Sequence, residues 1–192
     1  MGVRASEIVS GLWQGGWPPP GRWLAERGFS TRVLCAEEYQ PPFVCPEHVA
    51  ATTGMWDSNP WPGVEVIYVP LNDDETAQIE KPPRETLRLA LRAGRIVATR
   101  LGQRSKVLVT CWQGRNRSGL VSALSLHFHL GISGSAAKRI VQERRPYALR
   151  NPVFNGLLRN LRRPDHHLAE AVLASPAAIV ARFQVIPARR AP

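Results

Sequence analysis

Residues 107–119, VLVTCWQGRNRSG, constrain the fold of this chain more than any other segment. The apolar, β-branched residues at its start predict a short buried strand, and the residues from 117 to about 130 predict a helix. A short loop that contains Gly114 joins the two. The first N–H groups of a helix lack partners within it, and successive N–H groups of such a loop can converge on an anion. The segment therefore predicts a strand, an anion-binding loop and a helix in succession.

Two side chains give this loop its chemistry. Arg117 can donate two parallel hydrogen bonds to a phosphate group. Cys111 lies where the N–H groups of the loop and the Arg117 guanidinium converge. Nearby positive charge favours the thiolate, the nucleophilic form of cysteine. Gly114 permits the backbone angles of a tight curl. We expect the phosphate to be surrounded by Trp112, Gln113, Gly114, Arg115, Asn116 and Arg117.

The pattern Cys-x5-Arg-Ser resembles the signature of the cysteine-dependent protein phosphatases, and in particular their compact dual-specificity branch. The resemblance runs from about residue 6 to residue 161. Residues 8–16 resemble the opening strand and glycine turn of that branch, and residues 33–36 its next core strand. Arg145-Pro146-Tyr147, followed by Asn151 and Phe154, is similar to a late segment of the family. The resemblance implies phosphate-ester hydrolysis through a phosphocysteine, with no metal and no organic cofactor.

The resemblance also implies supporting roles around Cys111. The family places a general acid after a core strand, 30 to 40 residues before the cysteine, and its Pro-apolar-x-Asp pattern selects Asp73, with Asp74 and then Asp57 as alternatives. Ser118 would assist breakdown of the phosphocysteine. Asn151 would brace the phosphate loop, and it also precedes Pro152 as a helix cap.

One residue departs from the family pattern. The family usually has His immediately before the nucleophile, and this chain has Thr110. The histidine helps to orient the loop and to favour the thiolate, whereas threonine can donate one hydrogen bond but carries no charge. We therefore expect an activity optimum that is shifted upward in pH.

The substrate is left open by the sequence. Overall resemblance favours a tyrosine or dual-specificity protein phosphatase, and Trp112 beside the nucleophile can wall an aromatic substrate pocket. Arg115 adds a second cation, as in some lipid phosphatases of the superfamily. The residues from Gly114 to 119 also resemble the loop of RNA 5′-triphosphatases, although Asp73 argues against that class. A phosphate-binding pseudophosphatase is the non-catalytic alternative.

The formal net charge of +10 favours anionic partners. We expect a phosphorylated protein substrate, with an acidic phospholipid or an RNA 5′ end as alternatives. The three cysteines, at wide spacings, predict neither a disulfide framework nor a zinc site. No apolar run is long enough to span a bilayer, and residues 1–14 lack a secretory signal, so we expect a cytoplasmic protein without stable membrane insertion. Nothing indicates the oligomeric state.

Strands alternate with helices along the chain, which predicts an α/β fold. We expect a compact three-layer sandwich in which helices flank a central, mostly parallel sheet. The predicted strands cover residues 6–16, 31–36, 64–71 and 106–110. The predicted helices cover 21–27, 82–101, 117–130, 135–145 and a segment that begins at 151–152, and Ser135 is the predicted cap of the fourth helix. Residues 40–63 are predicted to form a loop. Residues 1–163 are predicted to form the catalytic domain, and 164–192 an Ala-, Pro- and Arg-rich extension.

Overall fold

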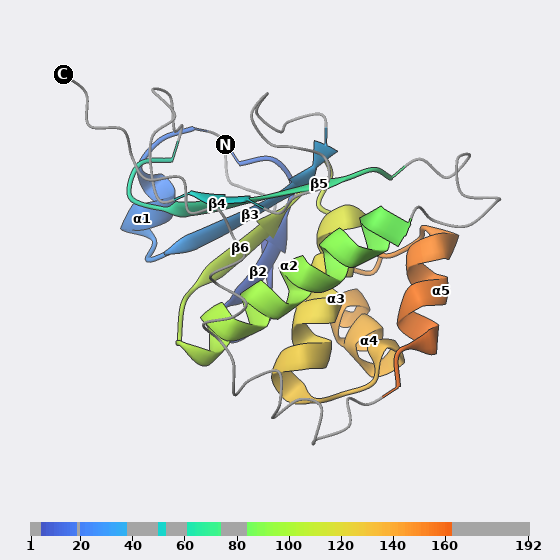
Figure 1. The fold of residues 1–192 in the computed structure, drawn as a ribbon. Helices are drawn as coiled ribbons and strands as arrows, with labels where there is room; N and C mark the ends of the chain where they lie inside the picture. The colour runs from blue at the N-terminus through green and yellow to red at the C-terminus, as the bar shows by residue number, and fades with distance from the viewer. Residues whose placement is uncertain (1–4, 19, 38–49, 53–60, 74–83, 163–192) are drawn as a thin grey trace.

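The computed structural model of the 192-residue chain describes residues 5–18, 20–37, 50–52, 61–73 and 84–162. These residues form an α/β fold in which helices flank a six-stranded sheet (Figure 1). The strands are β1 (Ala5–Val9), β2 (Leu12–Gly15), β3 (Thr31–Ala36), β4 (Ala50–Thr52), β5 (Glu65–Leu71) and β6 (Val107–Thr110). The helices are α1 (Trp23–Glu26), α2 (Arg84–Gly102), α3 (Arg117–Leu130), α4 (Gly134–Arg144) and α5 (Pro152–Asn160).

The sheet has the strand order β1-β2-β6-β3-β5-β4. Its four central strands, β2, β6, β3 and β5, are parallel, while β1 and β4 pair antiparallel at the two edges. The expectation of a mostly parallel sheet is confirmed. Because the carboxyl ends of parallel strands meet at one edge, the loop after β6 lies between the segments that follow β2 and β3. This arrangement brings residues from distant parts of the sequence to one place.

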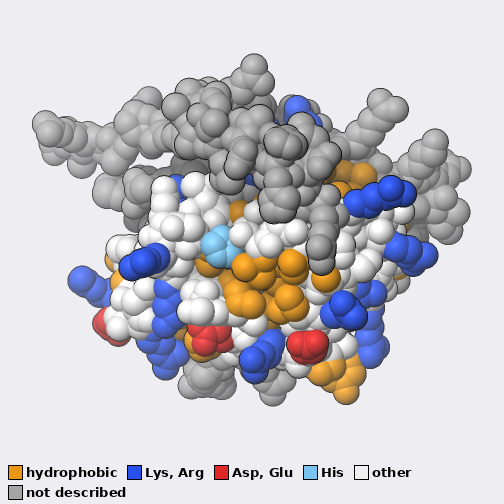
Figure 2. Space-filling model, turned by 90° about the horizontal axis from the view of Figure 1, so that it is seen from below, with side chains coloured by type: hydrophobic (Ala, Val, Ile, Leu, Met, Phe, Trp, Pro, Cys, Tyr) orange, Lys and Arg blue, Asp and Glu red, His pale blue; other side chains and the backbone are white. Residues whose placement is uncertain are grey.

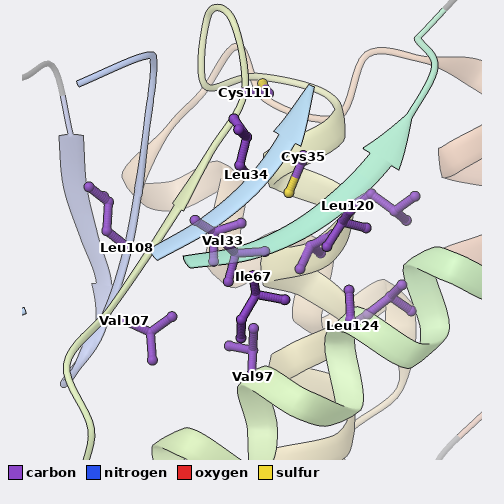
Figure 3. Close-up of a cluster of buried hydrophobic side chains, with 14 of the residues drawn as sticks. Val33, Leu34, Cys35, Ile67, Val97, Val107, Leu108, Cys111, Leu120 and Leu124 are labelled. Carbon is purple, nitrogen blue, oxygen red and sulfur yellow. The ribbon is translucent and has the colours of Figure 1, made fainter. Parts of the chain in front are cut away.

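Helices α2 to α5 gather on one face of the sheet, and the short α1 lies on the other (Figure 1). All six residues of β3 are buried, as expected for a parallel strand covered on both faces. Figure 3 shows Val33 and Ile67 of the sheet pointing toward Val97 of α2 and toward Leu120 and Leu124 of α3. This apolar layer fixes α3 against β6, and therefore fixes the loop between them.

Helices α2 and α3 approach each other closely at Gly94. A Cβ atom built on Gly94 would lie 2.6 Å from Cβ of Leu124, so only glycine fits there without a shift. The α2 residues that face the sheet and α3 are apolar and buried, and they repeat at helical spacing. The helix predicted over 82–101 is confirmed for the residues that the structure describes, and the helix predicted over 117–130 has the predicted bounds.

Three local predictions were wrong. Residues 6–16 form a hairpin of two strands rather than one strand, because the chain turns at Gly11, whose φ is +82°. The predicted loop over 40–63 contains the short edge strand β4. Helix α4 is capped by Ser133, whose hydroxyl accepts a hydrogen bond from the Ala136 N–H, and not by Ser135.

Several sequence predictions fall outside the described residues, namely those for Asp74, for Asp57 and for the extension 164–192. Within the described residues, no helix combines the length and the apolar character that crossing a membrane requires. Figure 2 views the face below the helices. Lys and Arg side chains lie around a central group of hydrophobic side chains there, so on this face the positive charge is spread out.

Candidate active site

The loop from Cys111 to Asn116 curls between β6 and α3, and Gly114 lies at its tightest point. Gly114 has a φ of +68°, in the left-handed region that favours glycine. Its carbonyl oxygen accepts hydrogen bonds from Gln14 Nε2 (3.0 Å) and Arg145 Nε (2.9 Å). The loop is also tied to the segment after β2, because the Trp17 N–H donates to the Trp112 carbonyl (3.3 Å). Residues far apart in the sequence thus hold the curl in place.

Cys111 is buried at the base of this loop. Its Sγ lies 3.3 Å from the Ser118 hydroxyl oxygen in the first turn of α3. At this distance Ser118 can donate a hydrogen bond to a thiolate at Cys111. The two residues that the sequence singled out as nucleophile and assistant are therefore in contact.

Arg117 reaches from the start of α3 toward the end of β5. Its Nη1 donates to the Leu71 carbonyl (3.4 Å), and its Nε lies 4.0 Å from Asp73 Oδ2. The other carboxylate oxygen of Asp73 accepts a hydrogen bond from Asn151 Nδ2 (2.9 Å). Asp73, Arg117 and Asn151 thus form a connected group beside Cys111, although they come from three separate parts of the chain.

Asn151 and Asn116 connect this group to the start of α5. The Asn151 side-chain oxygen accepts from the N–H groups of Val153 (3.0 Å) and Phe154 (3.3 Å), which confirms the predicted helix cap. The Asn116 side-chain oxygen accepts from the N–H groups of Arg150 (2.8 Å) and Asn151 (3.3 Å). Asn116 therefore contributes to the loop through its contacts with the protein backbone.

A pocket of about 350 Å³ opens above this loop. Of the predicted residues, its lining includes Asp73, Cys111, Trp112, Gln113, Arg115, Asn116 and Arg117. Tyr147 and Arg150 also line it, and the Arg150 guanidinium lies 4.9 Å from the centre of the Tyr147 ring. We assigned no role to either residue from the sequence. The signal that could have indicated Arg150 is its position directly before Asn151.

The charges around the loop are dominated by arginines. Arg145 is half-buried, and burial lowers the pKa of its guanidinium, an effect that Cys111 opposes and Arg115 reinforces. Leu34 of β3 pairs with Thr110 of β6. Cys35 and Cys111 therefore follow paired residues on neighbouring strands. Burial raises the pKa of the Cys35 thiol, and Cys111 adds to this effect while Arg117 and Arg32 oppose it. Cys35 and Cys111 both have free thiols.

Thr110 directly precedes Cys111, at the position where the phosphatases that the sequence resembles usually have histidine. Its hydroxyl donates to the Val33 carbonyl (3.0 Å) and accepts from Arg32 Nε (3.3 Å). Both bonds of the Thr110 hydroxyl are thus made to β3. Within the part of the chain that the structure describes, no group of three or more His, Cys, Asp or Glu side chains could hold a metal ion.

Comparison with solved structures identifies the fold. Human DUSP28 matches with 21% sequence identity and a TM-score of 0.59 over 90% of this chain and 97% of that one. Tk-PTP in its active form matches with 24% identity and a TM-score of 0.57 over 88% and 99%. PTPMT1 in complex with PI(5)P matches with 18% identity and a TM-score of 0.60 over 88% and 97%. Comparisons with protein-family models and with curated proteins find no match. The chain therefore has the fold of the dual-specificity phosphatases.

Proposed function

We propose that this protein is a cysteine-dependent phosphatase that hydrolyses phosphate esters on phosphorylated proteins, as dual-specificity phosphatases do. The observation that carries the proposal is the convergence of Cys111, Arg117 and Asp73 on one pocket. The dual-specificity phosphatase fold supports it. A nucleophile, a cation for the phosphate and an acid for the leaving group are the parts that phosphate-ester hydrolysis requires.

The first step transfers the phosphoryl group to the enzyme. The Cys111 thiolate attacks phosphorus, an S–P bond forms, and the P–O bond to the leaving group breaks. Protonated Asp73 gives its proton to the departing oxygen, which leaves as an alcohol. Arg117 and the N–H groups of the loop stabilise the equatorial oxygens. Asn151 positions the Asp73 carboxyl through its 2.9 Å hydrogen bond.

The second step releases phosphate. Water attacks phosphorus and the Asp73 carboxylate takes a proton from it, while the S–P bond breaks and the electron pair returns to sulfur. The Ser118 hydroxyl, 3.3 Å from Cys111 Sγ, donates a hydrogen bond to the departing thiolate. Phosphate and the free thiolate result, so all atoms and charges are accounted for without a metal ion.

Two exposed aromatic side chains support a phosphotyrosine substrate. Trp112 is 56% exposed and Tyr147 is 62% exposed, and both line the pocket. Exposed rings beside a phosphate site can pack against the ring of a phosphotyrosine. These rings favour an aryl phosphate over the phosphate of a serine or threonine.

A phospholipid is the second candidate substrate, because cations exceed carboxylates among the described residues that line the pocket. Arg115, Arg117 and Arg150 line it together with the Asp73 carboxylate. One phosphate group would occupy Arg117, and the two other arginines could hold a further anionic group. PTPMT1, whose fold is similar, was solved with PI(5)P bound.

The test of the mechanism is hydrolysis of para-nitrophenyl phosphate and of phenyl phosphate, with EDTA present. We expect metal-independent turnover that Cys111→Ser abolishes. We expect Asp73→Asn to slow turnover by roughly 10²-fold. The loss should be larger with phenyl phosphate, because phenolate is the poorer leaving group and needs the proton more. Cys35→Ala is the matched control, since among the described residues Cys35 is a second buried free thiol, and its removal should keep most of the activity.

The outcome decides between the remaining functions. No turnover at any pH, with tungstate or phosphate still bound, would replace the proposal with a phosphate-binding pseudophosphatase. For an active enzyme, kcat/KM is then compared on a phosphotyrosine peptide, on a phosphoinositide in mixed micelles and on an RNA 5′-triphosphate. Preference for the phosphoinositide, lost in Arg150→Gln but kept in Arg159→Gln, would favour the lipid.

A further inference from the structure

Arg32 is an arginine in the middle of the sheet. It lies on β3, between Leu108 of β6 and Val66 of β5 in the ladders, and it has no exposed surface. Among the described residues, it is the largest side chain that is fully buried. An arginine is rarely buried to this extent without a partner, because removing a charge from water is unfavourable.

Two tryptophans enclose the Arg32 guanidinium, and we call Trp17 and Trp61 the tryptophan cage. The guanidinium carbon lies 3.5 Å from the ring centre of Trp61 and 4.8 Å from that of Trp17. The two rings pack edge to face, with their centres 5.6 Å apart. Cation–π attraction is strongest for desolvated cations over tryptophan, so the cage offsets part of the unfavourable burial.

The polar contacts of Arg32 lead to the catalytic loop. Its Nε donates to the Thr110 hydroxyl (3.3 Å), and Thr110 is the residue directly before Cys111. Its Nη1 and Nη2 atoms are buried and have no hydrogen-bond partner among the described residues. Burial lowers the pKa of Arg32 to about 9, with Tyr68 and Cys35 acting in the opposite direction, so the side chain stays charged at neutral pH. The cation is thus linked by one hydrogen bond to the residue that precedes the nucleophile.

We infer that Arg32 is a positioning residue for the Cys111 loop and the source of a buried positive charge that favours the Cys111 thiolate. The inference rests on the proposed function and extends it. In this chain, Arg32 would supply the charge that Thr110 cannot carry. The upward shift of the pH optimum expected from Thr110 alone should therefore be small.

Arg32 and Trp17 of the tryptophan cage contact the two residues on either side of Cys111. Arg32 holds Thr110, and the Trp17 N–H donates to the carbonyl of Trp112 on the other side. The Thr110 hydroxyl donates its hydrogen bond to the Val33 carbonyl, so it cannot also donate one toward Cys111. In this proposal Arg32 acts on Cys111 in two ways, by fixing the Thr110 side chain directly before it and by its positive charge.

Other groups also influence the thiolate, and the test must separate them from Arg32. Cys111 faces the Ser118 hydroxyl, and it interacts electrostatically with Cys35 and Arg145. The pocket above it adds Arg115, Arg117 and Asp73. Arg32 itself interacts electrostatically with Tyr68 and Cys35. The substitutions at Arg32 and Arg100 below leave these groups in place, except Cys35, which is replaced in every protein compared, so the Cys35→Ala, Cys45→Ala protein is the reference.

The test measures the rate of Cys111 alkylation by iodoacetamide from pH 5 to 9, in a Cys35→Ala, Cys45→Ala background. Arg32→Met removes the charge and keeps much of the side-chain length, while Arg32→Lys keeps a charge. Arg100→Met is the matched control, because Arg100 is a part-buried arginine bonded to Glu65 at the start of β5, the end of that strand opposite Leu71. We expect Arg32→Met to move the midpoint of the profile to higher pH and to slow alkylation about tenfold at pH 6. Arg32→Lys should fall between this variant and the wild type, and Arg100→Met should match the wild type.

The inference would be overturned by a folded Arg32→Met whose profile matches the wild type, or by equal shifts in all three variants. Thermal unfolding reports which variants are folded. If Arg32→Met does not fold, Thr110→Val tests the positioning role, since it removes the link to Arg32 and keeps the charge. We then expect kcat to fall about tenfold with an unchanged alkylation midpoint, and an unchanged kcat would refute the role. Alkylation needs no turnover, so an enzyme that proved inactive would still test Arg32.

Discussion

The curl of the loop from Cys111 to Asn116 depends on the absence of a side chain at position 114. A Cβ atom on Gly114 would lie 2.5 Å from the Gly15 carbonyl oxygen and 2.6 Å from the Gly16 nitrogen, and it would also press on the Gly15 carbonyl carbon. These atoms belong to the backbone, so no side-chain rotation can relieve the collision. Gly114→Ala must therefore displace the loop from the end of β2.

The expected size of the effect follows from the contacts that change. A non-glycine residue in the left-handed region costs about 1–2 kcal/mol. The two hydrogen bonds to the Gly114 carbonyl would weaken, which adds roughly 1–2 kcal/mol. The free energy of unfolding should fall by about 2–4 kcal/mol, or about 4–16 °C in Tm for a chain of this size. A loop displacement near 1 Å should lower kcat/KM about 10²-fold.

Two other glycines provide matched controls. Gly28 has a φ of +76° and nothing within 4 Å of its Cβ position, so Gly28→Ala adds the same backbone strain without a collision. Gly156 lies inside α5 with open space around it, so Gly156→Ala should raise stability by about 0.5–1 kcal/mol. The assays are differential scanning calorimetry and para-nitrophenyl phosphate turnover. If Gly114→Ala matched Gly28→Ala in both, the collision argument would be wrong.

Two further predictions concern Asn151 and His127. Asn151→Ala removes the cap of α5 and the hydrogen bond to Asp73. Loss of the cap should lower Tm by about 2–4 °C, and loss of the hydrogen bond should lower kcat about tenfold at nearly constant KM. An unchanged kcat in steady-state kinetics would contradict a role for the contact with Asp73. Burial lowers the pKa of His127 from 6.5, an effect that Arg95 reinforces and the hydrogen bond to the Ile132 carbonyl opposes. A lowered pKa means that His127 binds a proton less readily in the folded state than in the unfolded state. The contribution of His127 to the free energy of unfolding is therefore fully present above pH 6.5, and it is lost as the pH falls below that value. The urea midpoint should therefore drop between pH 7.5 and 5.5, and His127→Asn should reduce this drop; an equal drop in the variant would exclude His127 as its cause.

Much of the fold could be predicted because its signals are local. Strand β3 and helix α3 have the predicted bounds, since a short β-branched run and a helical apolar repeat each indicate one structure. The errors arose where the local sequence signal was weak, or where two neighbouring residues carried the same signal. Strand β4 is three residues long at a sheet edge, and its pairing with β5 depends on tertiary contact. Ser133 and Ser135 could both cap a helix, and the chain geometry selected the first.

The sequence by itself determined the strand, loop and helix around Cys111, because neighbouring residues build that unit and its spacing is visible in the chain. Only the tertiary structure decided which distant residues surround it. Asp73 follows β5 and meets Asn151 at the start of α5 across 78 positions. Arg32 meets Thr110 across 78 positions because β3 and β6 are neighbours in the sheet. A charged residue within a strand predicted to be buried was the one sequence signal for Arg32. Its partners could not be read from the chain, since register is fixed by packing between strands rather than by local preference.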